Sequence, residues 1–149
     1  MARLEYRLLD EANHFPVLYY YDQIDKDEIS LRFACDYFVK GGVVYEKSSA
    51  AIEPAAYVIY VKPSAEEKVV PYTDAASLRW ARVQIEVRHY QEHTSHYPLV
   101  QLFQFTDDDD ALLHLQSDYL MLQGKEWEKT STEVDEDRKV YVYYARPTM

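Results

Sequence analysis

The run Tyr45-Glu46-Lys47-Ser48-Ser49 recurs 82 residues later as Trp127-Glu128-Lys129-Thr130-Ser131. At the same offset, residues 14–61 match residues 96–143 without a gap, with 12 identities over 48 positions. With one residue of slippage, Leu4-Glu5-Tyr6-Arg7 falls on Ile85-Glu86-Val87-Arg88. Self-similarity at a fixed spacing is the signature of a repeated structural unit. The sequence therefore predicts a tandem duplication.

Each copy is expected to form two strands, a helix and two further strands. Apolar and polar residues alternate with a period of two in the first strand of each copy, which is typical of half-buried strands, and aromatic residues recur at alternating positions in the last. These strands are 4–8, 17–21, 43–52 and 57–61 in the first copy, and 83–88, 99–105, 125–134 and 140–144 in the second. A helix is expected to begin near Asp25 or Thr106, which can cap an N-terminus, and to end at Gly42 or Gly124.

The expected fold class is α+β, a tandem duplication of a ββαββ unit with antiparallel sheets that are each covered by one helix. The first repeat spans residues 1–62, the linker 63–82 and the second repeat 83–149. We expect the two repeats to pack as one pseudo-twofold globule. The sequence leaves open whether their sheets lie back to back or form one continuous sheet.

The composition limits the classes of partner. The 149 residues include 26 acidic and 16 basic ones, for a formal net charge of −10. Nucleic-acid affinity comes largely from Lys and Arg, and an anionic membrane surface would repel this chain. We expect neither as a partner. Cys35 is the single cysteine, and residues 1–10 carry charges that break a signal-peptide core. The expected location is the cytoplasm.

Known catalytic motifs are poorly represented. With 3 glycines, the chain has no phosphate-binding glycine loop and no nucleophile elbow. Cys35 is interpreted as a small packed residue. His89, Glu92 and His93 spell H-x-x-E-H, but the preceding period of two places His89 at the end of a strand rather than on a helix. His89, His93 and His96 could form a metal site, with a solvated histidine-rich loop as the simpler interpretation, and no cofactor is predicted.

His14 and His96 are retained by both copies, each just before a strand. A pair of histidines facing each other across the axis between the copies could bind a metal or transfer a proton. A histidine that satisfies backbone groups of the turn beside Pro16 or Pro98 is the simpler interpretation. The two histidines are therefore weak catalytic candidates.

Tyrosine is abundant, at 15 residues. Aromatic side chains are enriched in interfaces, and small sheets also use tyrosine to fill their cores. The candidate surface for a ligand or partner comprises Tyr19, Tyr21, Tyr57, Tyr141 and Tyr143.

The preferred hypothesis is a non-catalytic binding or interaction module that uses the aromatic sheet face or the cleft between the repeats. Its partner would be a protein or a second copy of the chain, with a small molecule as a further option. One alternative is a small metal-assisted or acid–base enzyme with His14 and His96 in the cleft. A second alternative is an acidic mimic of nucleic acid.

Overall fold

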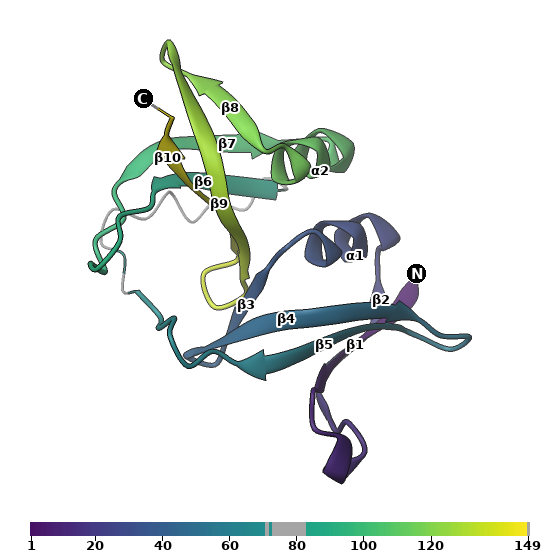
Figure 1. The fold of residues 1–149 in the computed structure, drawn as a ribbon. Coiled ribbons are helices and arrows are strands. Elements are labelled where there is room, and N and C mark those ends of the chain that lie inside the picture. The colour runs from purple at the N-terminus through teal and green to yellow at the C-terminus, as the bar shows by residue number, and fades with distance from the viewer. Residues whose placement is uncertain (71, 73–82, 149) are drawn as a thin grey trace.

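The first half of the chain folds into five strands and one α-helix. The computed structural model describes residues 1–70, 72 and 83–148. The elements, in purple to teal in Figure 1, are β1 (Ala2–Leu8), the short 3-10 helix η1 (Glu11–Asn13), β2 (Val17–Ile24), α1 (Lys26–Phe33), β3 (Tyr37–Lys40), β4 (Val43–Ile52) and β5 (Tyr57–Pro63).

The second half repeats this order without the 3-10 helix. Its elements, in green to yellow in Figure 1, are β6 (Val83–His89), β7 (Leu99–Phe105), α2 (Asp108–Gln116), β8 (Tyr119–Leu122), β9 (Lys125–Asp135) and β10 (Val140–Pro147). Asp25 and Asp107 stand at the N-caps of α1 and α2, and acidic residues occupy both first turns, where the helix dipole favours negative charge. Strands are confirmed over all eight segments where they were expected.

The expected fold class is wrong. The described strands form a single mixed sheet of ten strands, ordered β2-β1-β5-β4-β3-β9-β10-β6-β7, with β8 paired to β9. The molecule is therefore mostly β, and it is not a pair of antiparallel sheets with one helix on each. Within each half the first and last strands pair in parallel, β1 with β5 and β6 with β10. A third parallel pair, β3 with β9, joins the two halves.

The expected helices are too long, and this is one source of the error. The helices end at Phe33 and Gln116 instead of continuing to Gly42 and Gly124. The spacing of four that links Ile29, Phe33 and Tyr37 suggested one helix, but Tyr37 begins β3. Alternation cannot reveal a strand of four residues beside a helix, and it gives no information on whether strands pair in parallel.

The strand registers of the two halves correspond closely. A bulge follows Tyr6 in β1 and Val87 in β6, and another separates Lys47 from Ser49 in β4 and Lys129 from Ser131 in β9. In the last strand of each half, Val58 and Val142 occupy equivalent places in the register. The offset between the copies is therefore 84 residues in this strand rather than 82. The β9–β10 hairpin is thus two residues longer than the β4–β5 hairpin, by one paired residue in each strand, while both turns have four residues. The gapless match of the sequences misplaces this strand.

A single hydrophobic core spans both halves. It includes Leu4 and Leu31 from the first half and Leu115 and Tyr143 from the second. The two helices contact each other in the space between the strands of the first half and those of the second (Figure 1). None of the described helices has the length and apolar character needed to cross a bilayer.

Candidate functional site

The two halves meet along the parallel pair of β3 and β9. The backbone N–H of Asp36 donates to the carbonyl of Thr132 at 2.9 Å. In return, the N–H of Thr132 donates to the Asp36 carboxylate at 2.9 Å. Tyr37, Phe38 and Val39 then pair with residues 133–135. Asp36 lies within the helix that was expected to reach Gly42, but it follows the end of α1 at Phe33 instead, and its side chain binds the second half at the seam between the halves.

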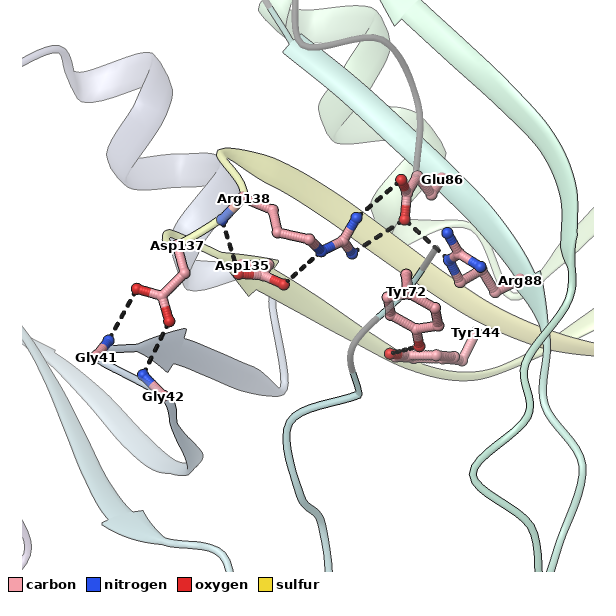
Figure 2. Close-up of polar contacts among 9 residues, drawn as sticks. All are labelled: Gly41, Gly42, Tyr72, Glu86, Arg88, Asp135, Asp137, Arg138 and Tyr144. Atoms are coloured by element: carbon pink, nitrogen blue, oxygen red, sulfur yellow. Dashed lines mark hydrogen bonds and ion pairs between the residues drawn. The ribbon is translucent and has the colours of Figure 1, made fainter. Parts of the chain in front are cut away.

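The β9–β10 turn, residues 136–139, reaches from the second half into the first, and we call it the clasp turn. The Asp137 carboxylate accepts hydrogen bonds from the N–H groups of Gly41 and Gly42, at 2.8 and 2.9 Å (Figure 2). Both glycines have positive φ, of 62° and 73°, a conformation that is costly for other residues. This geometry lets both N–H groups point at one carboxylate.

Arg138, the next residue of the clasp turn, binds back onto the second half. It donates two hydrogen bonds to Glu86 on β6, each at 3.0 Å, and one to Asp135 at 2.9 Å (Figure 2). Glu86 is fully buried and also accepts from Arg88 Nε at 2.9 Å. Burial alone would raise the pKa of Glu86, but the bonds from Arg138 and Arg88 outweigh it and lower that pKa.

The aromatic ring of Tyr72 covers this ionic network. The Arg88 guanidinium lies 3.6 Å from the ring centroid, and that of Arg138 lies at 4.8 Å. The Tyr72 and Tyr144 hydroxyls share a hydrogen bond of 2.7 Å (Figure 2). Cation–π contacts of this kind strengthen when the cation is removed from water. Tyr72 therefore ties the segment after β5 to the second half.

Glu136, the first residue of the clasp turn, pairs with Arg32 on α1. Arg32 Nη2 donates to Glu136 Oε2 at 2.6 Å, and Arg32 Nη1 donates to the Tyr6 hydroxyl at 3.3 Å. Lys40 lies 3.6 Å from the other oxygen of Glu136. Burial alone would raise the pKa of Glu136, but Arg32 and Lys40 hold it below its usual value.

A cavity of about 420 Å³ lies beside this ion pair, where the two halves meet. Leu31, Val83, Val134 and Val140 provide apolar walls, together with the rings of Tyr21 and Tyr141. The charged residues of its lining are Asp25, Glu28, Arg32, Asp108, Asp135, Glu136 and Lys139. A cleft of a few hundred Å³ with apolar walls and a few polar groups is the usual form of a small-ligand site. We therefore treat this cavity as the candidate site.

Two buried ionisable groups lie outside this lining. Burial, with the nearby charge of Asp135, raises the pKa of Glu133 to about 8. Burial lowers the pKa of His114 to about 4, and its ring lies among those of Phe103, Phe105 and Tyr143. At neutral pH the folded protein thus holds Glu133 protonated and His114 neutral. The sequence analysis identified neither residue.

The predicted histidine candidates lie away from the cavity. His14 is exposed at the C-terminus of the 3-10 helix with φ of 58°, and His96 is exposed in the loop before β7. His89 packs edge-on against Trp127, with ring centroids 5.3 Å apart. His93 is exposed. In the part of the chain that the structure describes, no three His, Cys, Asp or Glu side chains are grouped so as to hold a metal ion.

The five candidate tyrosines do not share one surface. Tyr141 and Tyr143 are buried in the core, and the Tyr143 hydroxyl donates to the Ser117 carbonyl at 2.7 Å. Tyr19 packs against Phe38 and Tyr45, and Tyr57 against Phe33. Only Tyr21 and Tyr141 of the five line the cavity. Cys35 is buried and its thiol donates to the Leu31 carbonyl at 3.4 Å, which matches its interpretation as a packed residue.

The clasp turn and Arg32 are not among the candidate residues predicted from the sequence. The charged run Asp135-Glu136-Asp137-Arg138-Lys139 stands where the first copy has Glu53-Pro54-Ala55-Ala56, so the departure of the two copies from each other was the available signal. Arg32 has His114 as its repeat partner, which gave no indication of a shared role.

Comparison with known proteins adds no further constraint on the site, because no family model, curated protein or solved structure matches the chain.

Proposed function

We propose that the protein is a non-catalytic binding protein, and that the cavity between its halves holds a small organic cation, an ammonium or guanidinium group on an apolar body. The observation that carries the proposal is the cavity itself, about 420 Å³ in volume, with walls from both halves and charged residues around apolar ones. Its volume lies in the range of small-molecule sites.

The charge of the lining favours a cationic ligand. Five carboxylates and two cationic side chains line the cavity, so its formal charge is −3. Arg32 is committed to Glu136, and its Nε lies 3.4 Å from Glu28. An anionic ligand would have to displace these carboxylates from Arg32. The net charge of the whole chain, −10, favours cations as well.

The walls favour a ligand with an apolar or aromatic body. The rings of Tyr21 and Tyr141 stand beside four aliphatic side chains. The electron-rich faces of aromatic rings attract cations, and the effect grows when the ring and the cation are shielded from water. A ligand of this kind would place its cationic group near the carboxylates and its apolar body against the rings and aliphatic side chains.

The chemistry of the lining supports binding rather than catalysis. Asp135 is held by Arg138, and Glu136 and Glu28 both lie against Arg32, so at least three of the five carboxylates already have cationic partners. Glu133, whose pKa is raised to about 8, and His114, whose pKa is lowered to about 4, do not line the cavity. The pKa values of the lining residues Tyr21, Arg32 and Tyr141 are raised above their usual values, so these groups keep their ordinary protonation states at neutral pH. The charge balance also keeps nucleic acids and membranes outside the proposal, and the cytoplasm remains its proposed location.

The test is a pair of NMR titrations with probes of similar size and opposite charge, 2-phenylethylammonium and 3-phenylpropionate. The amide signals of ¹⁵N-labelled protein are followed as each probe is added. We expect saturable shifts at Tyr21, Arg32, Val134 and Tyr141 with the ammonium probe. The carboxylate probe is expected to leave these signals in place. Saturable shifts of the same size with both probes would contradict the cationic preference, and shifts that map elsewhere would contradict the site.

A further inference from the structure

The strand segments that form the interface between the halves have equivalents in the other half of the repeat, and these equivalents do not pair with each other. Residues 37–39 of β3 pair in parallel with residues 133–135 of β9. By the repeat offset of 82, their counterparts are residues 119–121 of β8 and 51–53 in and after β4. Among the described strands, β8 pairs only with β9, and β4 pairs with β3 only at residues 43–46. Both counterparts therefore lie on sheet edges that no described strand covers.

The exposure of equivalent side chains shows the difference. Phe38 and Val39 are each 2% exposed, and Val134 is 4% exposed. Their counterparts are more exposed: Met121 is 68% exposed and Ile52 74%, while Leu120, the counterpart of Phe38, is half-buried. Tyr119, the counterpart of Tyr37, is 53% exposed. Natural edge strands are usually blunted by charges or proline. Residues 119–121 carry neither, and of residues 51–53 only Glu53 is charged, with Pro54 directly after it.

We propose that a second copy of this chain covers these edges, with β8 of one copy pairing in parallel with the end of β4 of the next. The occupant is a second copy because the chain already shows this pairing between its own halves. The expected register places Tyr119 beside Ala51, Leu120 beside Ile52 and Met121 beside Glu53, as β3 meets β9. This proposal is independent of the cavity and of its ligand.

Asp118 gives the pairing a polar anchor. Its repeat partner Asp36 accepts the N–H of Thr132 with its carboxylate. The Asp118 carboxylate is 83% exposed, with Lys129 at 4.0 Å, and the counterpart of Thr132 is Ala50. In the proposed pair, Asp118 accepts the N–H of Ala50 from the neighbouring copy.

The intermolecular pairing is weaker than the internal one. Glu136 N–H donates to the Val39 carbonyl at 2.8 Å, but its counterpart Pro54 has no N–H to donate. The first copy also lacks the clasp turn that secures the internal seam. The interface is head-to-tail, so two copies form a closed pair if the rotation between them closes, and a longer chain if it does not.

The experiment measures the mass of the full chain in solution by light scattering at a protein concentration of about 100 μM. At this concentration, a pair with a dissociation constant of about 1 μM is mostly associated. About 150 mM salt is present, so that repulsion between the two acidic chains is screened beyond about 8 Å. Wild-type protein is expected to show a mass of at least twice 17.6 kDa that falls on dilution. A mass of one chain at this concentration would overturn the proposal.

Two variants identify the edges. Met121→Lys blocks the β8 edge and Ile52→Lys blocks the β4 edge, and each is expected to weaken association at least tenfold. Mixing the two variants restores association, because one contributes an intact β4 and the other an intact β8. A symmetric pairing of β8 with β8 would not be restored in this way.

Leu113→Lys is the matched control, since Leu113 is exposed on α2 and lies on neither edge. It is expected to leave the mass unchanged. Thermal unfolding of each variant alone verifies that it is folded. Association that survives both edge variants, or a mixture that stays at the mass of one chain, would overturn the proposed pairing.

Discussion

Arg32 on α1 donates to Glu136 in the clasp turn at 2.6 Å, and this ion pair joins the first half of the chain to the second at the wall of the cavity. The two residues are 104 positions apart. The residues on either side of this contact extend it, since Asp137 binds the β3–β4 turn and Arg138 binds β6. Three consecutive residues of one turn thus determine how the halves, and the walls of the cavity, are placed.

Replacing Arg32 with Met is expected to destabilise the protein by about 2–4 kcal/mol, because Glu136 would keep its charge at a half-buried site without its main partner. Urea unfolding measures the change. In the double variant with Glu136→Gln, the loss is expected to be smaller than the sum of the two single losses. Asp22→Asn, at the exposed Arg3–Asp22 pair, is the control and is expected to change stability by less than about 0.5 kcal/mol. Strict additivity would contradict a direct interaction.

Replacing Asp137 with Ala is expected to cost about 1–3 kcal/mol, because the N–H groups of Gly41 and Gly42 lose a charged acceptor that serves both. Asp137→Asn keeps one acceptor oxygen, so its loss is expected to be intermediate. Glu92→Ala, in the exposed loop before β7, is the comparison. Equal stability of the Asp137 and Glu92 variants in urea unfolding would show that the clasp turn does not hold the seam.

The repeat predicts that Lys47 and Lys129 have the same role. Lys47 Nζ donates to the Phe33 carbonyl at 2.6 Å, and Lys129 Nζ donates to the Leu115 carbonyl at 3.0 Å, each at the C-terminal end of the helix in its own half. Replacing either lysine with Met is expected to cost about 0.5–1.5 kcal/mol, since a cation stabilises the terminal carbonyls of a helix. Chemical unfolding of both variants checks this. A loss for one lysine and none for the other would show that equivalent positions do not have equivalent roles.

The confirmed predictions have physical causes. Apolar and polar residues alternate in β1 and β6, and this alternation located both strands, although the polar positions Glu86 and Arg88 of β6 are buried as well. Lys47 and Lys129, which the repeat aligns with each other, each donate to a carbonyl at the end of the helix in their own half. The duplication itself stays a prediction of the sequence, supported by these shared contacts and registers.

The errors also have physical causes. The spacing of Ile29, Phe33 and Tyr37 fits a helix, but the segment after Phe33 pairs with β4 and with β9, and these pairings are long-range contacts that periodicity cannot register. The candidate site was missed for the same reason. Arg32 and Glu136 acquire their roles only when the two halves meet, and the histidines chosen because both copies keep them lie in exposed loops.

The raised pKa of Glu133 predicts a pH dependence of stability. With a pKa of about 8 in the folded state against 4.5 in the unfolded state, the folded protein binds the additional proton between these values. Stability from this group is therefore fully present below about pH 4.5 and is lost as the pH rises through 8, with a slope of at most about 1.4 kcal/mol per pH unit. Glu133→Gln is expected to gain stability over wild type across this window. A difference that is constant from pH 5 to pH 8 would contradict the buried, protonated carboxyl.

The most direct test of the proposed binding site removes one of its charges without disturbing its structure. Asp25 lines the cavity and stands at the N-cap of α1 without a side-chain capping bond, and Asn is an equally good N-cap residue. Asp27, two residues later, is exposed and does not line the cavity. The measurement is the dissociation constant of 2-phenylethylammonium for Asp25→Asn and Asp27→Asn, compared with wild type.

Both variants lose one negative charge, so the general electrostatic effect on a cation is matched between them. We predict that Asp25→Asn weakens binding about 3- to 10-fold, which corresponds to about 0.6–1.4 kcal/mol, while Asp27→Asn leaves the constant within about 1.5-fold of wild type. Equal effects of the two variants, or no effect of either, would contradict binding of the cation in the cavity between the halves.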